Sequence, residues 1–250
     1  MKSAEDILAM KGQEPVAMLT VYDYPTARAL DGSGLDILLV GDSVAQNELG
    51  LERTADLSLG MMLHHVRAVK RGVERTHILA DLPFGSYGKP AEALTSALAL
   101  MDAGANSVKL EGPRFEVVEH LVGAGVPVMG HVGLLPQTAK RTVRQGTKPE
   151  SAARIEQQAI GLANSGCYAV VLEFMSHDTA RSITDRVDVP TIGIGAGPGC
   201  DGQVLVISDM LGQHESVPSF VQKYASLYEV TVDAASRYRE DVKQRRFPNG

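Results

Sequence analysis

The sequence has little cysteine, few aromatic residues and no tryptophan. Aromatic residues make up 5% of its 250 residues, so the core must be built mainly from the aliphatic part of the 44% that is hydrophobic. The two cysteines, Cys167 and Cys200, lie far apart in the chain and form no CxxC motif. They predict two free thiols in a reducing compartment and argue against a disulfide framework.

A basic excess and long hydrophobic runs are also lacking. The formal net charge is −6, whereas nucleic-acid-binding proteins usually carry a basic excess. The short basic run at Lys243–Phe247 is typical of solvated surface. No run approaches the ~18 apolar residues of a membrane span, and the first residues include acidic ones where a signal peptide is apolar. We therefore expect a cytoplasmic protein that binds neither nucleic acid nor membranes.

Short aliphatic, β-branched runs recur along the chain. They are mostly continuous apolar stretches and do not alternate with polar residues, as expected for parallel strands that are covered on both faces. We predict strands at Val16–Val21, Asp36–Asp42, His77–Pro83, Ser107–Gly112, Val126–Gly133, Tyr168–Phe174, Pro190–Gly197 and Gln203–Met210.

Stretches of helical periodicity separate most of these strands. Several begin at a proline and end near a glycine, the asymmetry that is usual for helices. We predict helices at Tyr24–Gly34, Leu57–Gly72, Pro90–Gly104, Phe115–Gly125, Pro149–Gly166 and Ser176–Val187, with a short helix at Ser3–Met10 and a long amphipathic one at Pro218–Arg246.

Eight strands with intervening helices in 250 residues predict a single-domain (β/α)8 TIM barrel of class α/β. The domain would span residues 1–250, with a short N-terminal cap helix and a C-terminal helical segment. The connection at Pro198–Gly202 is too short for a helix, so a doubly wound open sheet is the alternative.

Polar residues fall at or near the carboxyl ends of the predicted strands. In a barrel these ends face one mouth, where active sites are built. Residues spread over a long stretch of sequence are therefore expected to converge on one site. They are Asp42, Ser43, Asp81, Lys109, Glu111, His131 and Glu173.

This set of side chains suggests metal-assisted acid–base chemistry. Three carboxylates, on Asp42, Asp81 and Glu111, would offer the oxygen ligands that Mg²⁺ prefers. Mg²⁺ could polarise a carbonyl group and stabilise an enolate. Lys109 lies two residues before Glu111 on the same side of its strand and could neutralise a substrate carboxylate. His131 could donate a hydrogen bond or carry a proton.

Glu173 stands in the apolar run VVLEF, between Leu172 and Phe174. Partial desolvation there is expected to raise its pKa and make it a better general base near neutral pH. Each residue taken alone has a simpler interpretation, such as a helix N-cap for Asp42, a core histidine for His131, or an arginine partner for Glu173. Five strand ends with ionisable groups together favour a metal or acid–base site, but they do not identify the reaction.

Two other motifs carry weaker signals. The glycine-rich segment GIGAGPG, Gly193–Gly199, lacks the Lys-Ser/Thr of a phosphate-binding P-loop and precedes no long helix. We interpret it as a turn at the barrel mouth. His64 and His65 are adjacent on a predicted helix and point away from each other, so packing or surface roles are favoured over metal binding.

Several stretches together resemble the ketopantoate hydroxymethyltransferase family. They occur in the family's order between Thr20 and about Gly212. They are TVYDYPTA, LLVGDS, LADLPFGSY, AGANSVKLEG, VPVMGHVGLLPQ, VVLEF and PTIGIGAGPGCDGQVLV.

This resemblance implies a barrel of the phosphoenolpyruvate mutase/isocitrate lyase type. It also implies Mg²⁺-dependent transfer of a hydroxymethyl group from 5,10-methylenetetrahydrofolate to 3-methyl-2-oxobutanoate, giving 2-dehydropantoate for pantothenate and coenzyme A synthesis. Ring-stacked homodecamers are expected on the same ground.

The resemblance assigns roles to matching residues of this chain. Asp42, Asp81 and Glu111 would lie at the metal, with Asp42 and Asp81 also near the substrate. Glu173 would accept the proton. Substrate contacts would come from Ser43, Lys109 and His131.

Two segments depart from the family pattern. Gly50–Thr54 reads GLERT where the family usually has G-x-[YHD]-[DS]-[ST]-T, and Ala139–Gly146 reads AKRTVRQG where it usually has GG-[YF]-x-VQG. Both would border the substrate or folate side of the mouth. A folate-independent 2-oxo acid aldolase or lyase of the same barrel group, and an inactive structural homologue, are therefore the alternatives.

Overall fold

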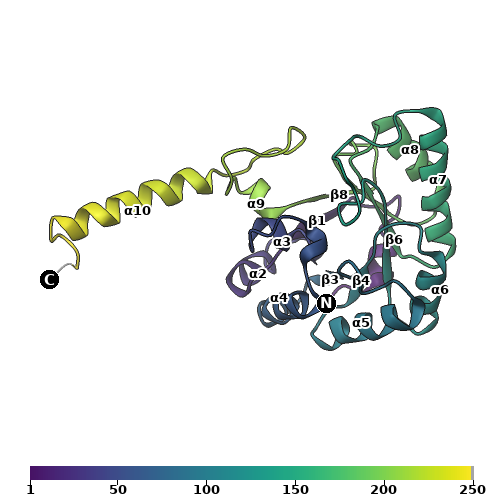
Figure 1. Cartoon of the computed structure of the whole chain (residues 1–250), viewed down its shortest axis with the longest axis horizontal. Helices are drawn as coiled ribbons and strands as arrows, with labels where there is room; N and C mark the ends of the chain where they lie inside the picture. The colour runs from purple at the N-terminus through teal and green to yellow at the C-terminus, as the bar shows by residue number, and fades with distance from the viewer. Residues whose placement is uncertain (249–250) are drawn as a thin grey trace. The chain divides into compact units, whose positions relative to one another are not determined.

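Eight parallel strands form the centre of the fold in the computed structural model, which describes residues 1–248. They close into a barrel in chain order, each paired in parallel with its neighbours (Figure 1). The strands are β1 (Val16–Thr20), β2 (Ile37–Val40), β3 (His77–Asp81), β4 (Ser107–Lys109), β5 (Val128–Gly133), β6 (Ala169–Glu173), β7 (Thr191–Ile194) and β8 (Gly202–Leu205). The predicted barrel is confirmed and the open sheet is excluded.

Helices follow most strands and cover the outside of the barrel (Figure 1). Ser58 caps α4 by accepting a hydrogen bond from the Met61 N–H, and prolines begin α5 and α7. The helices of this part are α1 (Ala4–Leu8), α2 (Tyr24–Leu30), α3 (Val44–Asn47), the 3-10 helix η1 (Thr54–Asp56), α4 (Leu59–Gly72), α5 (Pro90–Asp102), α6 (Phe115–Gly123), α7 (Pro149–Asn164) and α8 (His177–Arg186).

The short helix α1 contributes to the barrel core. Its Ala4 and Ile7, with Met10 just beyond, join an apolar cluster with strand residues such as Leu39 and Ile192. Since Ile7 is fully buried, α1 supplies apolar surface that the short strands cannot supply themselves. The predicted cap helix is present as Ala4–Leu8, and Ser3 caps it by accepting a hydrogen bond from the Asp6 N–H.

The chain divides into two compact units, Met1–Val204 and Leu205–Gly250. The second contains α9 (Ile207–Met210) and α10 (Leu227–Lys243). No residue of α10 is buried. No helix among residues 1–248 is long and apolar enough to cross a membrane.

Several predicted boundaries need correction. The strand predicted at Gln203–Met210 stops at Leu205, and Ile207–Met210 forms α9, because four residues suffice to pair β8 in the barrel. The helix predicted from Pro218 begins only at Leu227. Most strands also end earlier than predicted, and Asp81, Lys109 and Glu173 are the last paired residues of β3, β4 and β6.

Candidate active site

The structure brings the predicted residues together at the carboxyl end of the barrel. Asp42 follows β2, and its backbone N–H donates to Asp81 Oδ2 at 2.9 Å. Asp81 ends β3 directly opposite Lys109, the last residue of β4, and Lys109 Nζ lies 3.0 Å from Asp81 Oδ1. All three side chains are buried. Strand register therefore places the acidic and basic groups in contact.

His131 connects this group to the other two carboxylates. Its Nδ1 accepts from Lys109 Nζ at 3.4 Å and lies 3.7 Å from Glu111 Oε1. With Nδ1 accepting from Lys109, the ring hydrogen of neutral His131 lies on Nε2. Nε2 is 3.2 Å from Glu173 Oε2, but it forms no hydrogen bond in the described part of the chain. Lys109, the last residue of β4, and Glu111, two residues beyond it, both face His131. Burial, followed by the charge of Lys109, lowers the pKa of His131 and favours its neutral form.

Glu173 ends β6 at a point of unusual backbone geometry. Its side chain is 20% exposed, whereas those of Asp81 and Glu111 are 3% and 4% exposed, so Glu173 is the more accessible carboxylate. Phe174, the next residue, has φ of +43°, a left-handed conformation that is strained for a bulky side chain. Gly133 at the end of β5 has φ of +103°, and a Cβ atom there would lie 2.2 Å from the Glu173 carbonyl oxygen. A glycine is therefore needed beside Glu173.

The segment after β5 contacts both the backbone and the ring of Phe174. Gln145 N–H donates to the Phe174 carbonyl at 2.8 Å. Arg144 Nη1 donates to the carbonyls of Met175 and Gly195 at 2.7 and 3.0 Å, and its guanidinium lies 4.7 Å from the centre of the Phe174 ring. These contacts fix the backbone next to Glu173 in its strained form.

Gln137 is a site residue that the sequence reasoning did not single out. Its Nε2 donates to Asp42 Oδ2 at 2.8 Å and to the Leu82 carbonyl at 3.1 Å, and its N–H donates to Glu111 Oε2 at 3.2 Å. Tyr87 O–H donates to Gln137 Oε1. Gln137 thus orients two of the three buried carboxylates.

Tyr22 was also missed. Its hydroxyl lies 2.8 Å from Ser43 Oγ, so it fixes the serine beside Asp42. Their positions could have indicated a role at the site, because Tyr22, Tyr87 and Gln137 all lie within the stretches that carry the family resemblance.

The buried carboxylates repel one another, and this repulsion raises their pKa values. Burial and the charge of Asp81 raise the pKa of Asp42 to about 7. Burial and the charge of Asp42 raise the pKa of Glu111 to about 9. Burial opposes the charge of Lys109, but Asp81, Asp42 and Glu111 outweigh it and raise the pKa of Lys109. One lysine does not neutralise this much acid, so a bound cation would relieve the repulsion.

The donor set fits Mg²⁺. Among residues 1–248, no three His, Cys, Asp or Glu side chains are arranged as a ready metal-binding group. Mg²⁺, however, is commonly held by one or two carboxylates together with water and substrate oxygens. Asp81 Oδ1 is buried and lies 3.0 Å from Lys109 Nζ, so a cation bound here would share this oxygen with the lysine. Asp42 and Asp81 are the candidate ligands, with Glu111 beside them.

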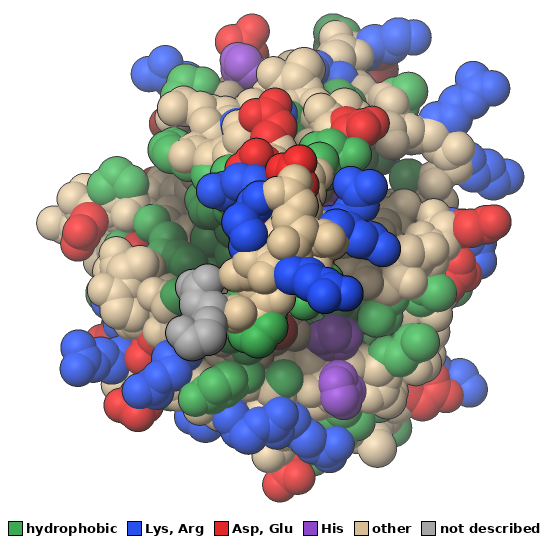
Figure 2. Space-filling model, turned by 90° about the vertical axis from the view of Figure 1, so that its left-hand side faces the viewer, with side chains coloured by type: hydrophobic (Ala, Val, Ile, Leu, Met, Phe, Trp, Pro, Cys, Tyr) green, Lys and Arg blue, Asp and Glu red, His purple; other side chains and the backbone are tan. Residues whose placement is uncertain are grey.

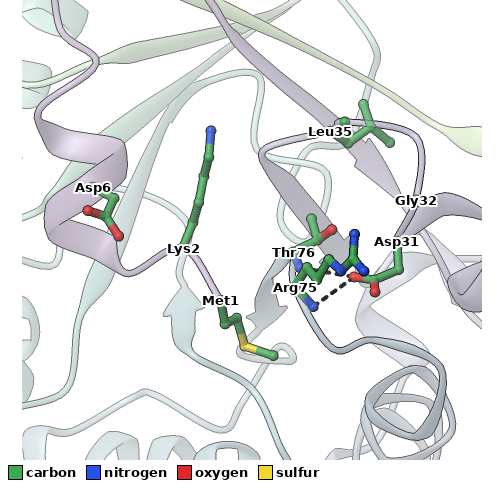
Figure 3. A pocket seen from close by; sticks show the side chains of 9 residues that line it. Met1, Lys2, Asp6, Asp31, Gly32, Leu35, Arg75 and Thr76 are labelled. Carbon is green, nitrogen blue, oxygen red and sulfur yellow. Dashed lines mark hydrogen bonds between the residues drawn. The ribbon is translucent and has the colours of Figure 1, made fainter.

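A pocket of about 500 Å³ lies at the opposite end of the barrel. Its lining includes Leu35 and Thr76, which come just before β2 and β3 (Figure 3). Asp31 accepts hydrogen bonds there from the backbone of Arg75 and Thr76. None of the predicted site residues lines this pocket, so it is separate from the candidate active site.

The weaker motifs take structural positions. Residues 195–201 form turns between β7 and β8, and Gly195 contributes the carbonyl that Arg144 contacts. His65 Nδ1 lies 2.7 Å from the Tyr22 carbonyl, and His64 packs edge-on against His65. In the divergent GLERT segment, Arg53 forms an ion pair with Asp56 at 2.6 Å and does not contact the site residues.

Solved structures with the same fold are distant in sequence. A phosphoenolpyruvate phosphomutase from Streptomyces platensis has a TM-score of 0.66 and 14% identity, covering 97% of this chain and 88% of its own. A 2,3-dimethylmalate lyase, a member of the phosphoenolpyruvate mutase/isocitrate lyase superfamily, has a TM-score of 0.62 and 17% identity, covering 100% of this chain and 91% of its own. They confirm the predicted type of barrel.

Sequence comparison is more specific. The family model for ketopantoate hydroxymethyltransferase matches residues 2–250. The 3-methyl-2-oxobutanoate hydroxymethyltransferase of Pyrococcus abyssi is 45% identical, covering 97% of this chain and 88% of the relative. The enzyme of the same name from Synechocystis is 46% identical, covering 94% of each chain. This chain therefore belongs to the ketopantoate hydroxymethyltransferase family.

Proposed function

We propose that the chain transfers a hydroxymethyl group from 5,10-methylenetetrahydrofolate to 3-methyl-2-oxobutanoate, with Mg²⁺ as cofactor, and so serves pantothenate synthesis. One observation carries the proposal. Glu173 is a partly exposed carboxylate at the barrel mouth, and His131 and Lys109 link it to a buried acidic cluster. A base beside a cation-binding centre is the arrangement that enolate formation requires.

The 2-oxo acid has complementary groups in this site. Lys109 offers a buried positive charge for its carboxylate, and Ser43 is fixed by Tyr22 for a further contact. The resident cation would be held by Asp42 and Asp81, near Glu111. When bound, Mg²⁺ would polarise the 2-oxo group and stabilise the negative charge of the enolate.

Glu173 removes the proton from C3 of the 2-oxo acid, and the C3 electron pair forms the new bond to the folate methylene carbon. Both C–N bonds between this carbon and the folate break, and water supplies the hydroxyl group. Tetrahydrofolate leaves with two added protons on its nitrogens, one from C3 and one from water. His131, neutral and bearing its hydrogen on Nε2, faces the base and can stabilise the anionic form of Glu173.

The direct test is formation of 2-dehydropantoate from the 2-oxo acid and 5,10-methylenetetrahydrofolate, with Mg²⁺ and after its removal by a chelator. We expect product only when all three components are present. Product without folate would favour an aldolase or lyase instead. Absence of both product and C3 proton exchange would indicate an inactive homologue.

We further propose a cytoplasmic homo-oligomer. The resemblance to a family of ring-stacked decamers is one ground. Helix α10 is the other, because it has no buried residue yet carries exposed apolar side chains, among them Val232 at 52% and Tyr238 at 58% exposed. A second copy of the chain would provide the surface that covers them.

A further inference from the structure

Gln137 is a buried amide that lies against the carboxylates of the barrel mouth. Gln137 and Tyr87 are only 6% and 5% exposed. The amide nitrogen faces two acceptors, Asp42 Oδ2 and the Leu82 carbonyl, while the amide oxygen accepts from the Tyr87 hydroxyl. A flipped amide would place its oxygen against both acceptors, so this network fixes the orientation of the amide. The Tyr87–Gln137 pair is therefore a rigid hydrogen-bond donor beside Asp42.

Each carboxylate of the buried cluster gives one oxygen to an N–H group. Gln137 supplies two of the three donors, its Nε2 to Asp42 Oδ2 at 2.8 Å and its backbone N–H to Glu111 Oε2 at 3.2 Å. The third donor is the Asp42 N–H, which reaches Asp81 Oδ2 at 2.9 Å. In the described part of the chain, Asp42 Oδ1 and Glu111 Oε1 accept no such bond. Asp42 therefore has one oxygen left for a cation.

This division of the oxygens favours a small cation. Ca²⁺ takes about six to eight oxygen ligands and often binds both oxygens of one carboxylate, whereas Mg²⁺ needs near-octahedral geometry and binds one or two carboxylates together with water. An oxygen that already accepts from an N–H group is a poorer cation ligand, because the hydrogen brings positive charge to it. Carboxylates with one accessible oxygen each therefore suit Mg²⁺ better than Ca²⁺.

We infer that the Tyr87–Gln137 pair restricts Asp42 to a single cation-binding oxygen and thereby selects Mg²⁺ over Ca²⁺ at this site. The inference rests on the cation-binding part of the proposed function. Gln137 is a positioning residue, since it acts through Asp42, and Tyr87 fixes Gln137. A merely structural role, in which Gln137 only ties the loop after β5 to Leu82, would change stability and leave the choice of cation unaltered.

Calorimetry of MgCl₂ and CaCl₂ binding to the intact protein, without 2-oxo acid or folate, tests this selectivity. Gln137→Met keeps the size of the side chain but cannot donate to Asp42. We expect the ratio of the two dissociation constants to shift about tenfold toward Ca²⁺, because Mg²⁺ loses a fixed ligand while Ca²⁺ gains a second oxygen. Tyr87→Phe should shift the ratio in the same direction by about threefold, since the amide remains but can turn.

Tyr168→Phe is the matched control for Tyr87→Phe. Tyr168 is 6% exposed, lies just before β6 at the other end of the barrel, and has its hydroxyl 2.9 Å from Ser107 Oγ. Both substitutions therefore remove a buried, hydrogen-bonded hydroxyl. The control should keep the wild-type ratio of dissociation constants whatever its effect on Tm. Thermal unfolding shows whether each variant is folded, and Tyr87→Phe decides the result if Gln137→Met is not.

Two results would overturn the inference. One is an equal change of both dissociation constants in Gln137→Met and Tyr87→Phe, which would show that the pair supports the site without choosing the cation. The other is tighter binding of Ca²⁺ than of Mg²⁺ by the wild-type protein. A failure of the proposed function is distinct from these. Selective Mg²⁺ binding that shifts as expected in the variants, without formation of 2-dehydropantoate by the wild type, would refute the proposed reaction and support the inference.

Discussion

Glu173 takes its chemical character from its immediate neighbours. VVLEF is an apolar run, yet its carboxylate is not enclosed, because β6 ends at Glu173 and the side chain reaches the mouth with 20% of its surface exposed. Phe174 leaves the sheet in a left-handed conformation that Arg144 and Gln145 stabilise. The proposed base therefore depends on a strained residue and on the loop that follows β5.

Asp81 connects the proposed metal-binding carboxylates to the lysine that we propose binds the substrate. Replacing Asp81 by Asn removes the charge that pairs with Lys109, while the amide can still accept from the Asp42 N–H. We expect the Mg²⁺ concentration for half-maximal activity and the KM for the 2-oxo acid to rise together, each by about 10-fold or more. Titrating activity against Mg²⁺ at several concentrations of the 2-oxo acid measures both. An unchanged Mg²⁺ requirement would remove Asp81 from the metal site.

The raised pKa values should make the proposed Mg²⁺ binding dependent on pH. In the metal-free protein Asp42 keeps its proton up to about pH 7, against an ordinary pKa of 3.8, so the free energy of unfolding falls as pH rises between these values. Mg²⁺ requires the ionised carboxylate, and its apparent affinity should rise by about tenfold per pH unit up to about pH 7. Thermal unfolding with and without Mg²⁺ at pH 5, 6, 7 and 8 tests this. A Mg²⁺-induced shift in Tm that does not grow with pH would contradict it.

At the scale of elements, the barrel strands could be predicted because they are continuous aliphatic runs. Helices α3 and α9 could not, because four residues are too few to show a helical period. The predicted strand ends correctly indicated which ionisable residues meet at the barrel mouth. Gln137 could not be predicted as a site residue, because an amide in a loop has no distinctive sequence pattern. Its role depends on tertiary contacts between the loop after β5 and the residues that follow β2 and β4.

The segment after β5 contacts the backbone next to Glu173, the proposed base, through Arg144. Replacing Arg144 by Ala removes its two carbonyl contacts and its stacking on Phe174, so the strained turn after Glu173 should relax. We expect kcat for C3 proton exchange to fall about 10-fold with little change in the KM for the 2-oxo acid. Arg144→Lys should recover little, because lysine lacks the planar fork. A loss confined to KM would show that Arg144 binds substrate and does not position Glu173.

At the scale of the whole molecule, the sequence predicted the barrel and the convergence of its strand ends, because both follow from topology. Acidic and basic side chains are interspersed on the face in Figure 2, with apolar side chains between them. The number of subunits is not encoded in any local pattern. Oligomer formation is instead a property of surfaces, of which α10 is the clearest example.

Helix α10 offers a matched pair of positions for testing the proposed oligomer. Tyr228, Val232, Tyr238 and Val242 share one apolar side of the helix, while Val230 lies on the opposite side. We expect Val232→Asp to lower the molar mass in solution and Val230→Asp to leave it unchanged, as measured by light scattering after size-exclusion chromatography. Equal masses for wild type and Val232→Asp would exclude this side of α10 as the contact between copies.

The central claim is that Glu173 deprotonates C3 of a 2-oxo acid. Exchange of that proton for deuterium, followed by NMR with Mg²⁺ and without folate, isolates this step. For Glu173→Gln we predict a loss of exchange of at least 10²-fold, with Mg²⁺ and 2-oxo acid binding retained by calorimetry. Exchange at the wild-type rate in Glu173→Gln would contradict the account and assign the base to another residue.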